Sequence, residues 1–243
     1  MSQAVFYWCF IAQDSCFSCA ERQLFPGQEL RVLLSDKAFQ RDLFWKQQRS
    51  AAGAVIKNGM VDRMMKNKSG FGLIHIYCGD GKGKTTAAVG LAVRAAGHGH
   101  NVYFTQFLKN GKSGELRVLE SLPNVTCKSG QIINKFSFQM NDEEKMKTKA
   151  LHHMYLSAVS EKIRIEKVDL VVLDEALGAI EAQLLDEQLL IDFLQTKPED
   201  LEVVITGRHP SERMLIMADY ISEVTCRRHP YEQDIPARKG IEY

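Results

Sequence analysis

The feature that most constrains the fold is a glycine-rich stretch, CGDGKGKTT at residues 78–86, lying between an apolar run and an alanine-rich segment. The apolar run Leu73–Cys78 predicts a strand, and Thr85–Ala96 predicts a helix. Glycines at such a junction let backbone N–H groups converge on phosphate oxygens, and the helix N-terminus adds partial positive charge. The stretch therefore predicts a phosphate-binding loop; a merely flexible glycine turn is the alternative.

The glycine spacing differs from the usual phosphate-binding pattern, G-x-x-x-x-G-K-[ST]. Counting back from Gly83, the first glycine of that pattern should be residue 78, where the chain has Cys78. We expect Lys84 to reach the phosphates, Thr85 to offer its hydroxyl to Mg²⁺, and Lys82 to add a second positive charge. The loop residues expected to bind nucleotide are Gly79, Asp80, Gly81, Lys82, Gly83, Lys84, Thr85 and Thr86.

A pair of carboxylates follows a second apolar run. Asp174 and Glu175 come directly after the predicted strand 169–173. In phosphate-loop proteins an acidic residue at this position reaches the metal, directly or through water. The pair therefore extends the predicted Mg-nucleotide site, and a solvated Asp-Glu pair at a strand end is the alternative.

Basic residues follow two other predicted strands. Arg208 follows strand 201–206, and open α/β sheets bind ligands beyond the carboxyl ends of their strands. Arg208 is therefore a candidate for contact with a phosphate chain. Lys109 and Lys112, after strand 101–107, are similar candidates. A solvated charge is the alternative for all three.

Strands and helices alternate from residue 71 onward. The predicted order is strand 73–78, helix 85–96, strand 101–107, strand 124–128, helix 142–167, strand 169–173, helix 186–195, strand 201–206, helix 211–219 and strand 220–226. Such repeats predict an α/β fold with a mostly parallel sheet and helices on both faces. Together with the phosphate-binding loop they indicate the P-loop NTPase-like (RecA-like) class. The residues expected on the buried face of helix 142–167 are Met146, Ala150, Met154, Ala158 and Ile165.

Residues 1–70 show no sustained periodicity of apolar residues and receive no domain assignment. Residues 71–243 are expected to form the functional domain. We expect much of residues 1–59 to be a dispensable extension or the product of a start codon assigned too early. The formal net charge of +1 gives no indication of nucleic-acid or membrane binding, and no apolar run approaches the roughly 18–20 residues that span a bilayer. The six cysteines form no metal framework, which is typical of a reducing, cytoplasmic compartment, and a redox or metal role for the C-x-x-C pair Cys16 and Cys19 is the alternative.

Residues 71–243 resemble the phosphate-loop family of ATP:corrinoid adenosyltransferases. The matching pieces are GDGKGKTTAA at 79–88, AAGHG at 95–99, QFLK at 106–109, VVLDEA at 171–176, ITGR at 205–208 and ARKGIEY at 237–243. The family reads G-x-G-x-G-K-T-T, so the resemblance implies that Cys78 simply ends the strand. Asp80 is a departure, because the family usually has Asn there.

The resemblance implies transfer of the 5′-deoxyadenosyl group of ATP to the Co(I) of a reduced corrinoid, with triphosphate as leaving group and ATP lying in the loop in a reversed sense. It implies Lys84, Thr85 and Glu175 as catalytic residues and Mg²⁺ as cofactor. Triphosphate would be neutralised by Lys82, Lys84 and Arg208, and Mg²⁺ held by Thr85 with Asp174 or Glu175. The alternatives are a phosphate-loop kinase or ATPase performing γ-phosphoryl transfer, and a nucleotide-gated regulatory module with little turnover.

The resemblance also implies a corrinoid-binding element and partners. In relatives, a Phe-x-Trp pair helps displace the lower axial ligand of cobalt, and the corresponding residues here are Phe136 and Phe138. Two core phenylalanines are the alternative for this pair. The partners implied are ATP, cob(I)alamin or a precursor corrinoid, a flavoprotein electron donor and a second copy of the chain, with no nucleic acid and no membrane.

Overall fold

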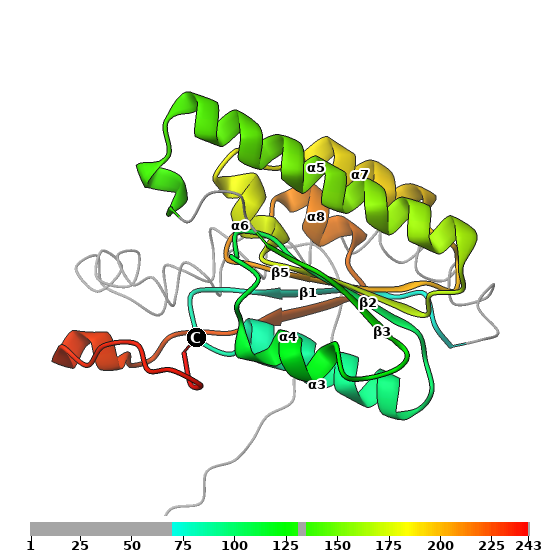
Figure 1. Cartoon of the computed structure of the whole chain (residues 1–243), viewed down its shortest axis with the longest axis horizontal. Helices are drawn as coiled ribbons and strands as arrows, with labels where there is room; N and C mark the ends of the chain where they lie inside the picture. The colour runs from blue at the N-terminus through cyan, green and yellow to red at the C-terminus, as the bar shows by residue number, and fades with distance from the viewer. Residues whose placement is uncertain (1–69, 131–134, 243) are drawn as a thin grey trace, which may run out of the picture. The chain divides into compact units, whose positions relative to one another are not determined.

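A computed structural model of the chain describes residues 70–130 and 135–242 (Figure 1). The predictions for residues 1–69 lie outside this part. The described residues form six strands: β1 Ile74–Cys78, β2 Val102–Gln106, β3 Val125–Lys128, β4 Leu170–Asp174, β5 Glu202–Thr206 and β6 Tyr220–Glu223. They make one sheet in the order β3-β2-β4-β5-β1-β6, and every pair of neighbours is parallel. The predicted parallel sheet is confirmed.

Helices cover both faces of this sheet, as predicted (Figure 1). The helices are α3 Lys84–Gly97, α4 Gly114–Leu119, α5 Asp142–Ile165, α6 Ala176–Glu181, α7 Glu187–Thr196 and α8 Glu212–Met217, with the 3₁₀ turns η1 Ser137–Gln139 and η2 Pro230–Gln233. In Figure 1, α3 and α4 lie below the sheet, and the other α-helices lie above it. None of the helices in residues 70–130 and 135–242 combines the length and the apolar character needed to cross a membrane.

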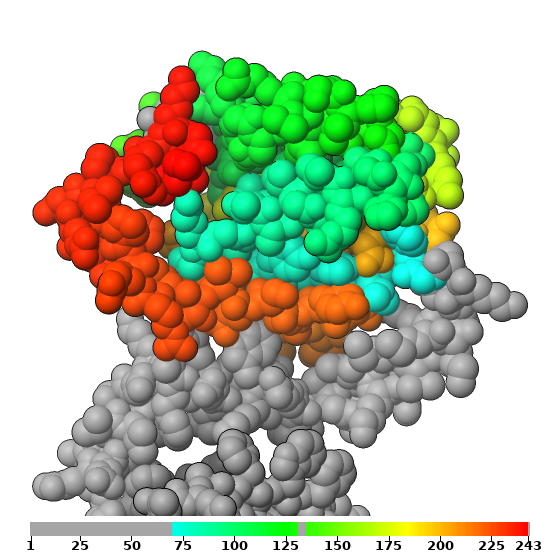
Figure 2. Space-filling view, turned by 90° about the horizontal axis from the view of Figure 1, so that it is seen from below, coloured from blue at the N-terminus to red at the C-terminus, as the bar shows by residue number. Residues whose placement is uncertain are grey.

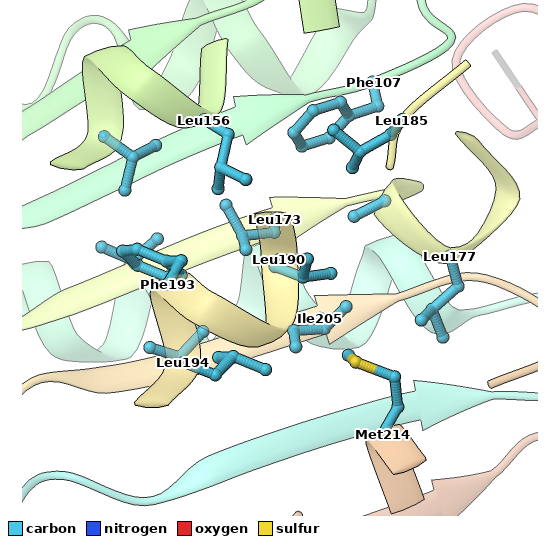
Figure 3. Packing of buried hydrophobic residues seen from close by; sticks show 14 of the residues in the cluster. Phe107, Leu156, Leu173, Leu177, Leu185, Leu190, Phe193, Leu194, Ile205 and Met214 are labelled. Atoms are coloured by element: carbon cyan, nitrogen blue, oxygen red, sulfur yellow. The ribbon is translucent and has the colours of Figure 1, made fainter. Parts of the chain in front are cut away.

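The side chains of the central strands alternate between two apolar clusters, one on each face. On β4, Val171 and Leu173 join the cluster beneath α5 and α7, whereas Leu170 and Val172 join the cluster against α3. This alternation follows from the two-residue period of a strand. Figure 3 shows Leu173 within the first cluster, among leucines of the covering helices. Because both faces of the sheet are buried against helices, the strands are held in place. The carboxyl ends of the strands, and the residues that follow them, are therefore held in place as well.

The buried face of α5 differs from the predicted one. Met146, Met154 and Ile165 are 66%, 66% and 64% exposed. The residues that α5 buries are Thr148, His152, Tyr155, Leu156 and Val159.

Hydrogen bonding explains why α5 buries a polar face. The His152 ring contacts the Leu184 carbonyl through Nδ1 at 3.0 Å and accepts the Leu108 N–H through Nε2 at 3.3 Å. The Tyr155 hydroxyl donates to the carbonyl of Gly130. Because these partners satisfy the polar atoms, burying them costs little, and the methionines are left on the solvent side.

Candidate functional site

The Gly79–Thr86 loop connects β1 to α3, as predicted, and Cys78 is the last residue of β1. Gly83 is the N-cap of α3 and has φ 120°, a left-handed conformation that favours glycine. A Cβ added to Gly79 or Gly81 would lie 2.5 or 2.8 Å from the carbonyl oxygen of Val224. The Gly81 N–H also donates to that oxygen at 2.7 Å. These two glycines are therefore required by the close approach of the chain that follows β6.

Asp80 also contacts the segment that follows β6. The Oδ1 atom of Asp80 accepts the backbone N–H of Cys226 at 3.0 Å. The residue that departs from the family pattern thus joins the loop to residues 224–226. The predicted strand 220–226 stops at Glu223, because the chain from Val224 onward packs against the loop instead.

Lys84 points back into the loop. Its ammonium donates to the Gly81 carbonyl at 2.7 Å, and the residue is only 9% exposed. Burial lowers the pKa of Lys84, and the guanidinium of Arg208 lowers it further, while the Glu175 carboxylate raises it. The buried ammonium is thus held among backbone carbonyl and carboxylate groups, at the place where the sequence predicts a phosphate contact.

Asp174 is the centre of a hydrogen-bond network at the carboxyl edge of the sheet. Its side chain is fully buried. Oδ1 accepts the hydroxyls of Thr85 and Thr206, each at 2.8 Å. Oδ2 accepts the amide of Gln106 at 3.2 Å and lies 3.2 Å from the ammonium of Lys109. Four donors thus satisfy both oxygens, as a buried carboxylate requires.

Glu175 turns the chain from β4 into α6. It has φ 61°, and its backbone N–H donates to the Thr206 hydroxyl at 2.9 Å. Burial raises the pKa of its carboxyl and Asp174 raises it further, while Lys109, Lys84 and Arg208 lower it. Among residues 70–130 and 135–242, its carboxylate accepts no hydrogen bond, so it is the carboxylate available to a ligand.

Arg208 and Lys82 lie at the exposed rim of the loop. The Arg208 carbonyl accepts the N–H of Gly79 at 3.0 Å, and its side chain is exposed. The ammonium of Lys82 lies 3.5 Å from a carboxylate oxygen of Glu242, which Arg238 also contacts at 3.0 Å. In the space-filling view the C-terminal residues, in red, lie beside cyan residues of the β1–α3 region (Figure 2).

The donor set is suited to Mg²⁺. Thr85, Asp174 and Glu175 present only oxygen atoms, which Mg²⁺ prefers. In the described part of the chain, no group of three or more His, Cys, Asp or Glu side chains could hold a metal ion. A site with one or two carboxylates is nevertheless what Mg²⁺ needs when substrate phosphates complete its shell.

Phe136 and Phe138 lie at the 3₁₀ turn η1, Phe136 as its N-cap and Phe138 within it. Their rings stack with centroids 5.5 Å apart and an interplanar angle of 7°. They are 70% and 80% exposed, so the interpretation of two core phenylalanines is wrong. A parallel, exposed aromatic pair is an apolar surface available to a partner or ligand.

Three members of the network, Gln106, Glu115 and Thr206, are not among the residues predicted from the sequence. Gln106 and Thr206 are the last residues of β2 and β5, and both are fully buried. The signal that could have found them is a polar residue at the end of an otherwise buried strand, beside the strand that carries Asp174. Of the lysines after β2, Lys109 enters the network, whereas Lys112 is exposed. Thr86 is exposed on the first turn of α3.

Comparison with known proteins identifies the family of the chain. The family model "ATP:corrinoid adenosyltransferase BtuR/CobO/CobP" matches residues 70–243. The corrinoid adenosyltransferase of Escherichia coli K12 is 30% identical over 211 residues, covering 86% of this chain and 100% of its own length. Corrinoid adenosyltransferase CobA of Salmonella typhimurium is 31% identical over 189 residues, covering 77% of this chain and 94% of its own. The chain belongs to the ATP:corrinoid adenosyltransferase family and is an enzyme of that family.

Proposed function

We propose that this enzyme transfers the 5′-deoxyadenosyl group of ATP to the Co(I) ion of a reduced corrinoid and releases triphosphate. The observation that carries the proposal is the placement of Lys84 and the Thr85–Asp174 pair at one end of the sheet, within a domain that the family model matches over residues 70–243. A loop that positions phosphates and a metal ion suits a reaction whose nucleophile belongs to the substrate.

In the proposed step, a lone pair on Co(I) attacks the ribose C5′ of ATP. The Co–C bond forms as the C5′–O bond breaks, and the bonding electrons leave with the triphosphate. Cobalt changes formally from Co(I) to Co(III), and no proton is transferred. The protein therefore has to align the reactants and stabilise the negative charge that gathers on the leaving group.

The cations around the loop are suited to that task. Lys84 would exchange its bond to the Gly81 carbonyl for one to a phosphate oxygen. Arg208 and Lys82 lie at the rim, where they would meet the rest of the triphosphate. Charge-assisted hydrogen bonds of this kind are stronger than neutral ones and favour the transition state as the leaving group becomes more negative.

Thr85 and Glu175 are the proposed Mg²⁺ ligands, and Asp174 would act through Thr85. Asp174 already has four donors on its two oxygens, whereas Glu175 has none among the described residues. Bound with ATP, Mg²⁺ would supply positive charge to the phosphate oxygens. Thr206 would position both acidic residues, because its hydroxyl donates to Asp174 and accepts the N–H of Glu175.

We propose that Phe136 and Phe138 contact the corrinoid. Their stacked rings form an exposed apolar wedge, which suits a large, flat macrocycle. Phenylalanine at position 138, where relatives carry tryptophan, keeps an aromatic face of smaller area.

The decisive experiment is anaerobic incubation of the protein with ATP, Mg²⁺ and chemically reduced cob(I)alamin. We expect the absorbance change of Co–C bond formation together with equimolar triphosphate. Release of ADP would instead indicate a kinase or ATPase, and ATP binding without either product would indicate a regulatory module.

The further partners are also proposals. A flavoprotein would supply the electron that gives Co(I), and the chain would act as a homodimer in the cytoplasm. Light scattering on the purified protein tests the dimer, and coupling of the reaction to a reduced flavoprotein tests the electron donor.

A further inference from the structure

Lys109 lies beside the buried carboxylate of Asp174, although it comes from a loop rather than from a strand. The turn after β2 fixes its position: Leu108 has φ 56°, and its N–H donates to Nε2 of His152 at 3.3 Å. The Lys109 ammonium is thereby held 3.2 Å from Asp174 Oδ2 and 3.5 Å from Glu115 Oε1.

Glu115, in the first turn of α4, belongs to the same network. The Gln106 amide donates to Glu115 at 3.0 Å and to Asp174 at 3.2 Å, so it bridges the two carboxylates. Burial raises the pKa of Glu115, but hydrogen bonds from its own backbone N–H and from Gln106, together with the charge of Lys109, outweigh burial and lower the pKa. Both carboxylates therefore share Lys109 as a cationic neighbour.

Asp174 needs this cation because it is fully buried. A buried charge is costly unless it is paired and hydrogen-bonded. Within the described residues, Lys109 is the only basic group that forms an ion pair with Asp174. The ammonium of Lys84, by contrast, donates to the Gly81 carbonyl.

We propose that Lys109 is a positioning residue that serves as the resident counter-ion of the metal site. It holds Oδ2 of Asp174, which leaves Oδ1 aligned with the Thr85 hydroxyl. It also keeps the carboxylates of Asp174 and Glu175 from attracting a divalent cation before nucleotide arrives. Metal binding is thereby coupled to ATP binding, an inference that rests on the proposed Mg-nucleotide site.

The proposal predicts opposite changes in two affinities when Lys109 is replaced by methionine. The site becomes more negative by one charge, so a divalent cation binds more tightly without nucleotide, by roughly tenfold. For the same reason ATP in the absence of metal binds roughly tenfold more weakly. A merely structural defect would weaken both affinities.

The test uses the full chain and needs no corrinoid. Binding of Mn²⁺, as a probe for Mg²⁺, is followed by the loss of its free electron paramagnetic resonance signal, and binding of ATP with EDTA present is followed by calorimetry. The variants are Lys109→Met, Lys109→Arg, which restores the charge, and Lys112→Met, which removes an equal charge from an exposed position in the same loop. Lys109→Gln replaces Lys109→Met if the methionine variant does not fold.

We expect tighter Mn²⁺ binding and weaker ATP binding for Lys109→Met only, with wild-type values for Lys109→Arg and Lys112→Met. Unchanged or weaker Mn²⁺ binding in a folded Lys109→Met protein would overturn the proposal. Because the readouts are binding constants, they stay informative if the protein fails to make adenosylcorrinoid, which would overturn only the proposed function.

Discussion

The carboxylate of Asp80 accepts the backbone N–H of Cys226 at 3.0 Å, across 146 positions of the chain. The side chain that places a negative charge in the loop therefore also fastens the loop to the segment after β6. An asparagine has the same acceptor oxygen without the charge.

Asp80→Asn should therefore strengthen ATP binding without loosening the loop. Removing a negative charge beside the triphosphate lowers the KM for ATP, by roughly three- to tenfold, and leaves kcat little changed. Asp80→Ala is the control, because it removes both the charge and the acceptor and should lower the Tm. An unchanged KM for ATP in Asp80→Asn would show that the charge does not reach the nucleotide.

Lys84→Ala should nearly abolish activity. The side chain is buried in the loop and its ammonium donates to the Gly81 carbonyl, so its loss removes charge where the leaving group is proposed to form. We expect kcat/KM to fall by about a hundred- to a thousandfold. Lys82→Ala, at a half-exposed position paired with Glu242, should cost much less. Wild-type kcat/KM in the Lys84 variant would refute the assignment of the site.

Gly81→Ala should lower both stability and ATP affinity. Its Cβ would lie 2.8 Å from the Val224 oxygen and 2.9 Å from the Thr225 carbonyl carbon, which are backbone atoms that cannot easily move. Gly90→Ala is the matched control, because this glycine lies inside α3 and its Cβ would meet nothing within 4 Å. Alanine there should stabilise the protein by up to about 1 kcal/mol. Equal Tm values for the two variants would contradict the packing described here.

Phe138→Ala should impair use of the corrinoid more than use of ATP. The side chain is 80% exposed, so the Tm should not change, whereas the KM for cob(I)alamin should rise. Tyr231→Ala, at a 77% exposed aromatic residue of η2, is the control and should leave both KM values unchanged. Equal losses for the two substrates would count against a corrinoid contact.

His152 should make the protein less stable in mild acid. Burial lowers the pKa of its ring to about 4, and its Nε2 can accept the Leu108 N–H only while the ring is neutral. The unfolded chain, with an ordinary histidine pKa of about 6.5, therefore binds the proton first. The free energy of unfolding should fall as pH drops from 6.5 to 4, by about 3 kcal/mol over the whole range.

Urea unfolding of the wild type and His152→Gln at several pH values measures this contribution. The variant lacks the titrating ring, so its free energy of unfolding should depend less on pH in that interval. His153→Gln is the control, because His153 is not fully buried. Parallel pH curves for wild type and His152→Gln would contradict the prediction.

Much of this architecture could be predicted from the sequence, because few folds contain a strand, a loop with three glycines and a helix in direct succession. The alternation of apolar runs also predicted the six strands, with ends correct to within a few residues. Helices α4 and α6, of six residues each, were not predicted, whereas α8, of the same length, was predicted as part of helix 211–219.

The misses concern side chains whose environment depends on distant partners. The exposed methionines of α5 follow the expected apolar spacing, yet His152 and Tyr155 are buried because carbonyl groups elsewhere in the chain accept their hydrogen bonds. Gln106 and Thr206 are recognisable as site residues only once β2, β4 and β5 lie side by side. The apolar pattern of the sequence alone does not show which strands are neighbours in the sheet.

The contact between Gly81 and Val224 also limits when this enzyme can become active during its synthesis. The loop is made early, at the start of the domain, but the backbone against which it packs emerges from the ribosome more than 140 residues later. A nascent chain released before β6 would have the complete glycine sequence without the support that shapes it. At the proposed ATP site, nucleotide should therefore stabilise only chains that extend at least through Val224, so a chain cleaved before that residue would lose this protection.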